Sequence, residues 1–256
     1  MDLTIVLPTK NSGKFISYFL KSLKSQDYKN YVIYIADGGS TDDTLKIINQ
    51  FNLNYKIISL NDQSAEEGVN KCLKEINTKY FCIFNSDDFI GEKNYLSGLI
   101  QTLNKTNSDV VFPNFGSLIS ESKKKILDQS YSFERILTNN VVPDISWIAK
   151  TSVLNEGLYS TDYKVATSYH FLLRLYKKGY KFKRDKNFNY YFRMGGQSYK
   201  YGYLGYKECR DIAIVFGGNK IKAYKSFLIN SAKFLIKYKL LKFYFGVKRW
   251  KNIFTL

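Results

Sequence analysis

The fold is decided by the stretch Tyr80-Phe81-Cys82-Ile83-Phe84-Asn85-Ser86-Asp87-Asp88. It begins with a short apolar run, which is typical of a strand buried in a sheet. Two adjacent carboxylates follow where this strand ends, and buried carboxylates are unfavourable unless a cation or hydrogen-bond donors meet them. The stretch therefore predicts a buried strand that carries Asp87 and Asp88 to a polar site. The alternative is an Asx turn or helix cap that merely ends the strand.

Strand and helix signals alternate around this stretch, through the first 115 residues. The predicted strands are Leu3–Leu7, Tyr31–Ala36, Tyr55–Leu60, Tyr80–Phe84 and Asp109–Phe112. Between them, apolar residues recur at the spacing of an amphipathic helix. Strands that alternate with helices build a mostly parallel sheet with helices on both faces. The sequence therefore predicts an α/β fold.

Polar clusters follow three of the predicted strands. They are Thr9–Asn11, Asp37–Asp43 and Asn85–Asp88. In an open parallel sheet the ligand lies beyond the carboxyl ends of the strands. We therefore expect the three clusters to lie together and to form one ligand site.

The turn after the second predicted strand contains two neighbouring glycines. Gly38 and Gly39 allow the backbone to come close to a ligand. Ser40 with Asp43 matches a capping box that opens the next helix. We expect Asp37, at the start of this turn, to contact the ligand.

The pair Asp87 and Asp88 has the chemistry of a divalent metal site. Mg²⁺ and Mn²⁺ prefer oxygen ligands, and Mg²⁺ is commonly held by one or two carboxylates together with substrate phosphates. Such an ion would neutralise the charge that develops on a diphosphate leaving group. We predict Mn²⁺ or Mg²⁺ as the cofactor.

The composition of the chain limits the class of protein and the compartment in which we expect it. The chain has 256 residues and a net charge of +17, and from Ile212 to Leu256 it has ten Lys and Arg but no Asp or Glu. The three cysteines, Cys72, Cys82 and Cys209, lack metal-ligand or redox spacing, which favours a reducing compartment. We expect no signal peptide, and no uncharged apolar stretch reaches the roughly 20 residues that span a bilayer.

Four blocks of the sequence, taken together, identify a family. They are Pro8-Thr9-Lys10-Asn11, Asp37-Gly38-Gly39-Ser40-Thr41-Asp42, Asp62–Lys71 and Asn85-Ser86-Asp87-Asp88. In order and spacing they resemble the family 2 glycosyltransferases with the GT-A fold, and especially the bacterial branch that builds surface polysaccharides. Later stretches, Gly157–Tyr159, Lys164–Leu175 and Gly195–Ser198, also resemble blocks of this family.

The resemblance implies an organisation and a set of site residues. Residues 1–115 would be the nucleotide-sugar-binding half, 116–205 the acceptor-binding half of the same domain, and 206–256 a basic helical tail. Asp88 would bind the metal, and Asp87 the ribose. The other residues expected to bind the nucleotide sugar are Pro8, Thr9, Asn11, Asp37, Gly38, Asp62, Asn70, Lys71, Gly196 and Ser198. Many members have a second Asp where this chain has Gly38.

The general base departs from the family pattern. The family usually places an Asp just before the helix that here contains Phe171–Leu175, and this chain has Ser168 at that place. A serine hydroxyl cannot act as a base at neutral pH. His170, whose ordinary pKa near 6.5 suits removal of a hydroxyl proton, and Asp144, in an apolar stretch, are the candidate bases.

The basic tail allows three interpretations. Lysines beside apolar and aromatic residues can dock on an anionic membrane surface. The apolar residues Phe227, Leu228, Phe234 and Leu235 are predicted to share one face. The tail could instead pack on the catalytic domain. Binding of nucleic acid is not expected, because no recognition motif accompanies the charge.

Together with the predicted metal site, the resemblance implies a metal-dependent, inverting glycosyltransferase. It would move a sugar from a nucleotide diphosphate donor, with UDP favoured, to a glycan or lipid-linked saccharide acceptor. We expect a cytoplasmic enzyme, peripheral on the inner membrane face. The rivals are a nucleotidyltransferase, which would usually carry a glycine-rich phosphate loop after its first strand, and a nucleotide-sugar-binding protein without activity.

Overall fold

The computed structural model describes residues 1–60, 62, 64–120, 123–126, 133–142, 145–193 and 201–236. Contacts within the chain group into two compact units. The sheet unit comprises Met1–Gln129, Pro143–Tyr159 and Lys178–Arg193, and the helical unit comprises Ser130–Val142, Ser160–Lys177 and Met194–Leu256. The functional halves expected from the sequence, 1–115 and 116–205, with a tail at 206–256, stay a prediction.

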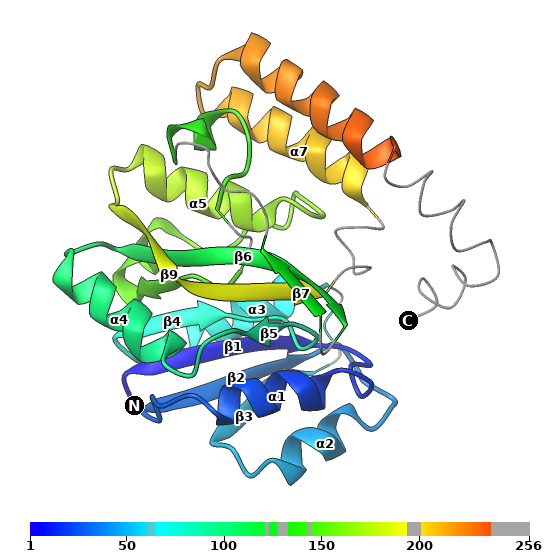
Figure 1. Ribbon diagram of the computed structural model, residues 1–256, viewed down its shortest axis with the longest axis vertical. Coiled ribbons are helices and arrows are strands. Elements are labelled where there is room, and N and C mark those ends of the chain that lie inside the picture. Colours follow the sequence, from blue (N-terminus) through cyan, green and yellow to red (C-terminus); the bar gives the residue numbers. More distant parts are fainter. Residues whose placement is uncertain are drawn as a thin grey trace. The chain divides into compact units, whose positions relative to one another are not determined.

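A single nine-stranded sheet forms the centre of the sheet unit within the described residues (Figure 1). Its strands run in the order β3-β2-β1-β4-β8-β6-β9-β5, and β7 pairs with β6. The strands are β1 (Leu3–Thr9), β2 (Tyr31–Asp37), β3 (Tyr55–Leu60), β4 (Tyr80–Ile83), β5 (Phe89–Ile90), β6 (Val110–Ser120), β7 (Lys123–Ile126), β8 (Ile148–Lys150) and β9 (Phe182–Arg193).

The parallel core of the sheet confirms the predicted α/β fold. β1 pairs with β2 and β4, and β2 pairs with β3, all in parallel. β8 then runs antiparallel to both β4 and β6, and β9 runs parallel to β6. β1, β2 and β4 therefore end at the same edge of the sheet, where the polar clusters follow them.

Helices cover both faces of this sheet (Figure 1). They are α1 (Ile16–Lys24), α2 (Thr44–Gln50), α3 (Ala65–Lys74) and α4 (Tyr95–Lys105). Apolar residues of α1, α2 and α4 share one core with the β1 residues Leu3, Ile5 and Leu7. α3 contacts β1, β2 and β3 from the opposite face. Each fully buried Leu, Ile or Phe in this core contributes about 1.5–3 kcal/mol.

The packing of α3 depends on a small residue. A Cβ at Gly68 would come within 2.9 Å of the Ala36 Cβ, so only a glycine lets the helix approach β2 this closely. Ser64 begins the helix, since its side chain accepts a hydrogen bond from the Glu67 N–H at 3.1 Å. α3 thus lies directly beside the end of β2.

The helical unit is built from α5 (Thr167–Lys177), α7 (Gly202–Val215) and a helix over residues 220–236, with the short 3₁₀ helix Phe133–Leu137. α5 is the helix expected from the sequence to contain Phe171–Leu175. Its N-terminus is capped from another helix, because the Glu208 carboxylate of α7 accepts hydrogen bonds from the N–H groups of Lys164, Val165 and Ala166 at 2.9–3.0 Å. A carboxylate also opposes the positive end of the helix dipole.

The 220–236 helix corrects one detail of the expected tail. Phe227 and Phe234 face α7, where their rings lie 5.6 and 6.2 Å from those of Tyr203 and Tyr206. Leu228 is exposed instead. The predicted apolar face is therefore only partly covered: its inner side, with the two phenylalanines, packs on α7, and its outer side, with Leu228 and Leu235, is exposed. Within the part of the chain that the structure describes, no helix has the length and apolar content to cross a bilayer.

Candidate active site

Hydrogen bonds join the three polar turns at the carboxyl edge of the sheet. The Gly38 N–H donates to the Thr9 carbonyl at 2.8 Å, and the Asn11 N–H donates to Ser40 Oγ at 2.9 Å. The hydroxyls of Ser12 and Ser86 lie 2.7 Å apart and connect the first turn to the acidic turn. Turns that are far apart in sequence therefore form one polar surface, as predicted.

Asp37 organises the turn after β2. Only 1% of the residue is exposed, and its carboxylate accepts hydrogen bonds from the N–H groups of Gly39 and Ser40, at 3.1 and 2.8 Å. Gly39 has a φ of +80°, which favours glycine. The predicted capping box of Ser40 and Asp43 is wrong, because Ser40 Oγ bonds to Asp37 and Asn11 instead.

Asp88 is a buried acid at the mouth of β4. It is 1% exposed, and its carboxylate accepts hydrogen bonds from the Tyr190 hydroxyl (to Oδ2, 3.1 Å), from the Arg193 N–H (to Oδ1, 2.9 Å) and from the Asn85 side chain. Burial, and then the charge of Asp87, raise the pKa of Asp88 well above its usual value. The pKa of Asp87 is also raised by burial, although the Arg193 charge opposes the shift.

Arg193, at the end of β9, is a site residue that the sequence reasoning missed. Its Nε–H donates to the Asp87 carbonyl at 3.1 Å, and its guanidinium lies 4.2 Å from the centre of the Phe15 ring. One positive charge is thus fixed beside two acids. The sequence did carry a signal for this residue, because Arg193 lies just before Gly195–Ser198, a stretch that resembles a block of the family.

Asp62, Lys71 and Ser59 form a second polar group beside the end of β3. Lys71 Nζ and Ser59 Oγ donate to Asp62 Oδ1 at 2.7 and 2.6 Å. Burial acts to raise the pKa of Asp62, but these hydrogen bonds and the Lys71 charge outweigh it, so the pKa is lowered. A Cβ at Gly68 would lie 2.5 Å from Asp62 Oδ2, so the glycine makes room for the carboxylate.

Two buried polar atoms at this edge have no hydrogen-bond partner within the described residues. They are Thr9 Oγ1 and Asp62 Oδ2. A buried polar atom without a partner is unfavourable by about 1–3 kcal/mol, so such atoms mark places where a ligand can bond. Pro8, which precedes Thr9, is partly buried. Asn70 is engaged already, because its amide exchanges hydrogen bonds of 2.8 and 3.0 Å with the Tyr159 backbone.

Of the two candidate bases, the structure describes His170 but not Asp144. His170 lies on α5 in the helical unit, with ring centroids of Tyr163 and Phe216 at 5.1 and 5.4 Å. Burial, with the Arg174 charge, lowers the pKa of His170, so the imidazole is held neutral at physiological pH. Asp144 lies outside the described residues, as do Gly196 and Ser198. Ser168 is buried.

The acidic turn has the chemistry needed for a divalent cation. In the described residues no cluster of three or more His, Cys, Asp or Glu forms a closed metal cage. Mg²⁺ and Mn²⁺ do not require one, because phosphates and water complete their coordination. The Asp88 carboxylate accepts hydrogen bonds from Tyr190, Arg193 and Asn85, and the two oxygens of a carboxylate together offer about four acceptor positions. Asp87 and Asp88 therefore fit such an ion.

The sheet order and the place of the acids define a GT-A glycosyltransferase. Two solved structures share this fold. The crystal structure of Staphylococcus aureus TarS 1–349 matches with a TM-score of 0.68 at 21% identity, and covers 96% of this chain and 75% of that one. The mannosyltransferase PcManGT from Pyrobaculum calidifontis, in complex with GDP-Man and Mn²⁺, matches at 0.67 and 14% identity, with 98% and 83% covered.

The chain belongs to glycosyl transferase family 2, whose sequence profile matches residues 4–194. A relative in Methanococcus voltae is named dolichyl N-acetyl-alpha-D-glucosaminyl phosphate 3-beta-D-2,3-diacetamido-2,3-dideoxy-beta-D-glucuronosyltransferase. It is 25% identical over 238 residues, which are 83% of this chain and 74% of the relative. The poly(ribitol-phosphate) beta-N-acetylglucosaminyltransferase TarS of S. aureus is 32% identical over 117 residues, 43% of this chain but only 20% of TarS. The family and fold expected from the sequence are thus confirmed.

Proposed function

We propose that this glycosyltransferase moves a sugar from a UDP-sugar, with inversion and with Mn²⁺ or Mg²⁺, to a glycan or lipid-linked saccharide acceptor in surface-polysaccharide synthesis. One observation carries the proposal: Asp88 is buried beside Asp87 where β4 ends, with donors on both carboxylate oxygens. Relatives support the donor and acceptor classes, since TarS has been solved with UDP-GlcNAc and the M. voltae enzyme is named for a dolichyl N-acetylglucosaminyl phosphate.

The donor would bind along the carboxyl edge of the sheet. Pro8, Thr9 and Asn11 would lie by the nucleoside, and Thr9 Oγ1 is supported as a contact because it is buried without a partner within the described residues. Asp37 and Gly38 would lie by the base or ribose. With these assignments, the polar surface that the three joined turns form would face one side of the ligand.

A second set of residues would approach the nucleotide from α3 and the later blocks. Asp62 offers its Oδ2, which has no hydrogen-bond partner among the residues that the structure describes, and Lys71 donates to the other oxygen of that carboxylate. Asn70 would act through the Tyr159 backbone that it already binds. Asp87 would contact the ribose, and Gly196 with Ser198 would lie by the diphosphate.

Catalysis would consist mainly of positioning and charge stabilisation. Asp88 would hold a divalent ion, and such an ion would supply positive charge to the departing diphosphate. Arg193 balances one of the two acids, so the site with its ion would carry net positive charge, which favours binding of a diphosphate. A base, Asp144 or His170, would take the proton of the acceptor hydroxyl.

Calorimetry with UDP tests this function directly. We expect Mn²⁺ to raise the affinity for UDP in the wild-type chain, and the double variant Asp87→Ala, Asp88→Ala to lose that gain. Asp43→Ala is the matched control, because Asp43 is an exposed acid on the neighbouring turn. Equal affinity with and without Mn²⁺ in the wild type contradicts a metal-bound donor. Release of UDP from a UDP-sugar separates the enzyme from a binding protein without activity.

The outer side of the 220–236 helix supports a membrane partner. Ile221, Leu228 and Leu235 recur every seven residues on this side, with exposed fractions of 80, 63 and 49%. Exposed Lys220 and Lys225 line a surface hollow together with Ile221 and Leu228. Residues 212–256 contain no acidic side chain. An exposed apolar stripe among lysines suits the interface of an anionic bilayer, where each lysine contributes about 1 kcal/mol.

Sedimentation with vesicles tests this partner, and with it a peripheral location on the inner membrane face. The full chain should sediment with phosphatidylserine-containing vesicles, and the double variant Ile221→Asn, Leu228→Asn should bind about tenfold less. Val215→Asn is the control, because Val215 is an exposed apolar residue of α7 outside the stripe. Equal sedimentation of wild type and double variant contradicts the membrane proposal and leaves the donor site unaffected.

A further inference from the structure

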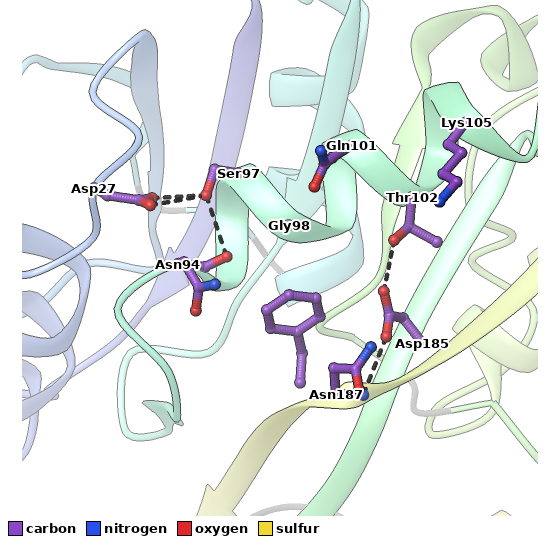
Figure 2. A pocket seen from close by; sticks show the side chains of 10 residues that line it. Asp27, Asn94, Ser97, Gly98, Gln101, Thr102, Lys105, Asp185 and Asn187 are labelled. Carbon is purple, nitrogen blue, oxygen red and sulfur yellow. Dashed lines mark hydrogen bonds between the residues drawn. The ribbon is translucent and has the colours of Figure 1, made fainter.

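A groove lies on the α4 face of the sheet unit, between that helix and β9 (Figure 2). It has a volume of about 610 Å³, within the range of small-ligand sites. The residues predicted to hold the donor lie elsewhere, at the carboxyl edge of the sheet. No role assigned so far uses this groove.

One wall of the groove is a bulge in β9. The pairing of β6 with β9 shifts after Pro113, so residues 186–188 stand out from the ladder. Asp185 fixes the bulge, because it accepts hydrogen bonds from Thr102 Oγ1 of α4 at 2.6 Å and from the Asn187 N–H at 3.0 Å (Figure 2). Bulges of this kind commonly re-aim side chains at functional sites.

The floor of the groove is apolar and closely packed. The Phe188 ring lies so near α4 that a Cβ at Gly98 would come 2.0 Å from its Cζ. Tyr95 packs edge-on against the same ring, with centroids 6.1 Å apart. The end wall is Asp27, whose carboxylate accepts a hydrogen bond from Ser97 Oγ at 2.8 Å (Figure 2).

Three amide side chains line the groove and remain available to a ligand. They belong to Asn94, Gln101 and Asn187, and none of them has a hydrogen bond from its side chain to another described residue. Each amide offers two donor hydrogens and an acceptor oxygen. An apolar floor with amides around it matches a ligand that has a C–H face and hydroxyls at its rim.

The charges in the groove further limit the class of ligand that it can bind. Asp27 and Asp185 are acidic, and Lys105 is the basic residue among those that line it. An anionic ligand such as a nucleotide would meet net negative charge. A purely apolar ligand would remove the amides from water without replacing their hydrogen bonds. We propose that this groove binds a neutral saccharide, as a subsite for the acceptor glycan.

This inference rests on the proposed function, since the glycan it names is that enzyme's acceptor. β9 links the two places, because Asn187 lies in the groove and Arg193 beside the acids, about 20 Å apart along an extended strand. A glycan of several sugars can span that distance. A groove at this separation would retain a long acceptor while its growing end is at the donor site.

Saturation-transfer NMR on the full chain tests the groove, with chitotriose, cellotriose and mannotriose as probes. We expect at least one probe to receive saturation, and the double variant Gln101→Ala, Asn187→Ala to bind about tenfold more weakly, because two hydrogen bonds are lost. Both residues are exposed, so the fold should be retained. Gln50→Ala, an exposed glutamine of α2, and Asp88→Asn should leave the signal unchanged.

Three results would overturn the groove proposal. They are absence of signal from every probe, a signal that the double variant retains, and a signal that Asp88→Asn removes. An acetylated Ser-Asn-Ser peptide that loses its signal in the double variant, when the sugars show none, would point to a peptide groove instead. UDP release by hydrolysis of UDP-N-acetylglucosamine should stay at the wild-type rate in the double variant, so failure of the donor site is recognised separately.

Discussion

The carboxyl edge of the sheet unit and the outer side of the 220–236 helix place their groups in opposite ways. The sheet edge buries charge: Asp37 and Asp88 are each 1% exposed and hold several hydrogen bonds. The helix exposes apolar surface, such as Ile221 at 80%. Buried acids indicate chemistry on a charged ligand, whereas exposed apolar residues among lysines indicate a surface that another body covers. The proposed donor site and the proposed membrane-binding surface therefore rest on opposite kinds of observation.

The largest expected effect comes from removing the buried charge. Asp88→Asn preserves the shape and can keep the hydrogen bonds to Tyr190 and Arg193, but it removes the charge that a divalent ion needs. We expect turnover of the donor to fall by about 10³-fold or more. The measurement is UDP release at saturating Mn²⁺, with Asp43→Asn as the control on the exposed part of the same edge. Turnover within about tenfold of wild type would contradict the assignment of Asp88.

The general base gives the next effect. We expect that one of the variants His170→Ala and Asp144→Asn loses about 10²-fold or more in turnover. If His170 is the base, the acid limb of the rate profile lies below pH 6.5, since burial and Arg174 lower its pKa. If both variants stay within a fewfold of wild type, neither residue is the base.

The sequence predicted the sheet unit well because its signals are local. The apolar runs at Leu3–Leu7 and Tyr80–Phe84 are long enough to be strands, and the acids follow them directly. Parallel pairing then brings all the carboxyl ends to one edge, whatever the exact register. The connected polar surface of Thr9, Asp37 and Ser86 is a consequence of that topology.

The sequence did not reveal those contacts of the site that join residues distant along the chain. Tyr190 and Arg193 reach Asp88 from β9, more than 100 residues later. Ser40 looked like a helix cap, but its hydroxyl is taken by Asp37 and Asn11 across the turn. Periodicity alone does not decide which side of the 220–236 helix is covered, because that depends on which of its aromatic residues pack against α7.

A smaller effect concerns the stability of the metal-free chain. The pKa of Asp88 is raised in the folded state by burial and by Asp87, so the folded protein binds more protons than the unfolded one between the usual and the raised pKa. Stability therefore falls as pH rises through this window. Asp88→Asn has no such loss, and in EDTA at neutral pH it should be more stable by about 1–3 kcal/mol.

Denaturant titration at several pH values measures this difference. It should be small near pH 4 and grow as the pH rises through the window between the usual and the raised pKa. Saturating Mn²⁺ should reduce it, because the ion stabilises the wild-type charges. A difference independent of pH would show that the acids are not the cause, and would weaken the contrast between a charged edge and an apolar helix.

The smallest effect concerns Ser146, a backbone outlier in the sheet unit. Ser146 has a φ of +83°, is fully buried, and has no partner for its hydroxyl within the described residues. Its N–H donates to the Ile83 carbonyl at 3.1 Å, and its own carbonyl accepts from the Tyr95 hydroxyl. Ser146→Ala removes only the buried hydroxyl, whereas Ser146→Gly also removes the strain at positive φ. We expect glycine to stabilise by about 0.5–1 kcal/mol, and by more than alanine. Thermal unfolding of the two variants separates the contributions, and an alanine variant as stable as the glycine variant would mean that the hydroxyl, rather than the backbone, carries the cost.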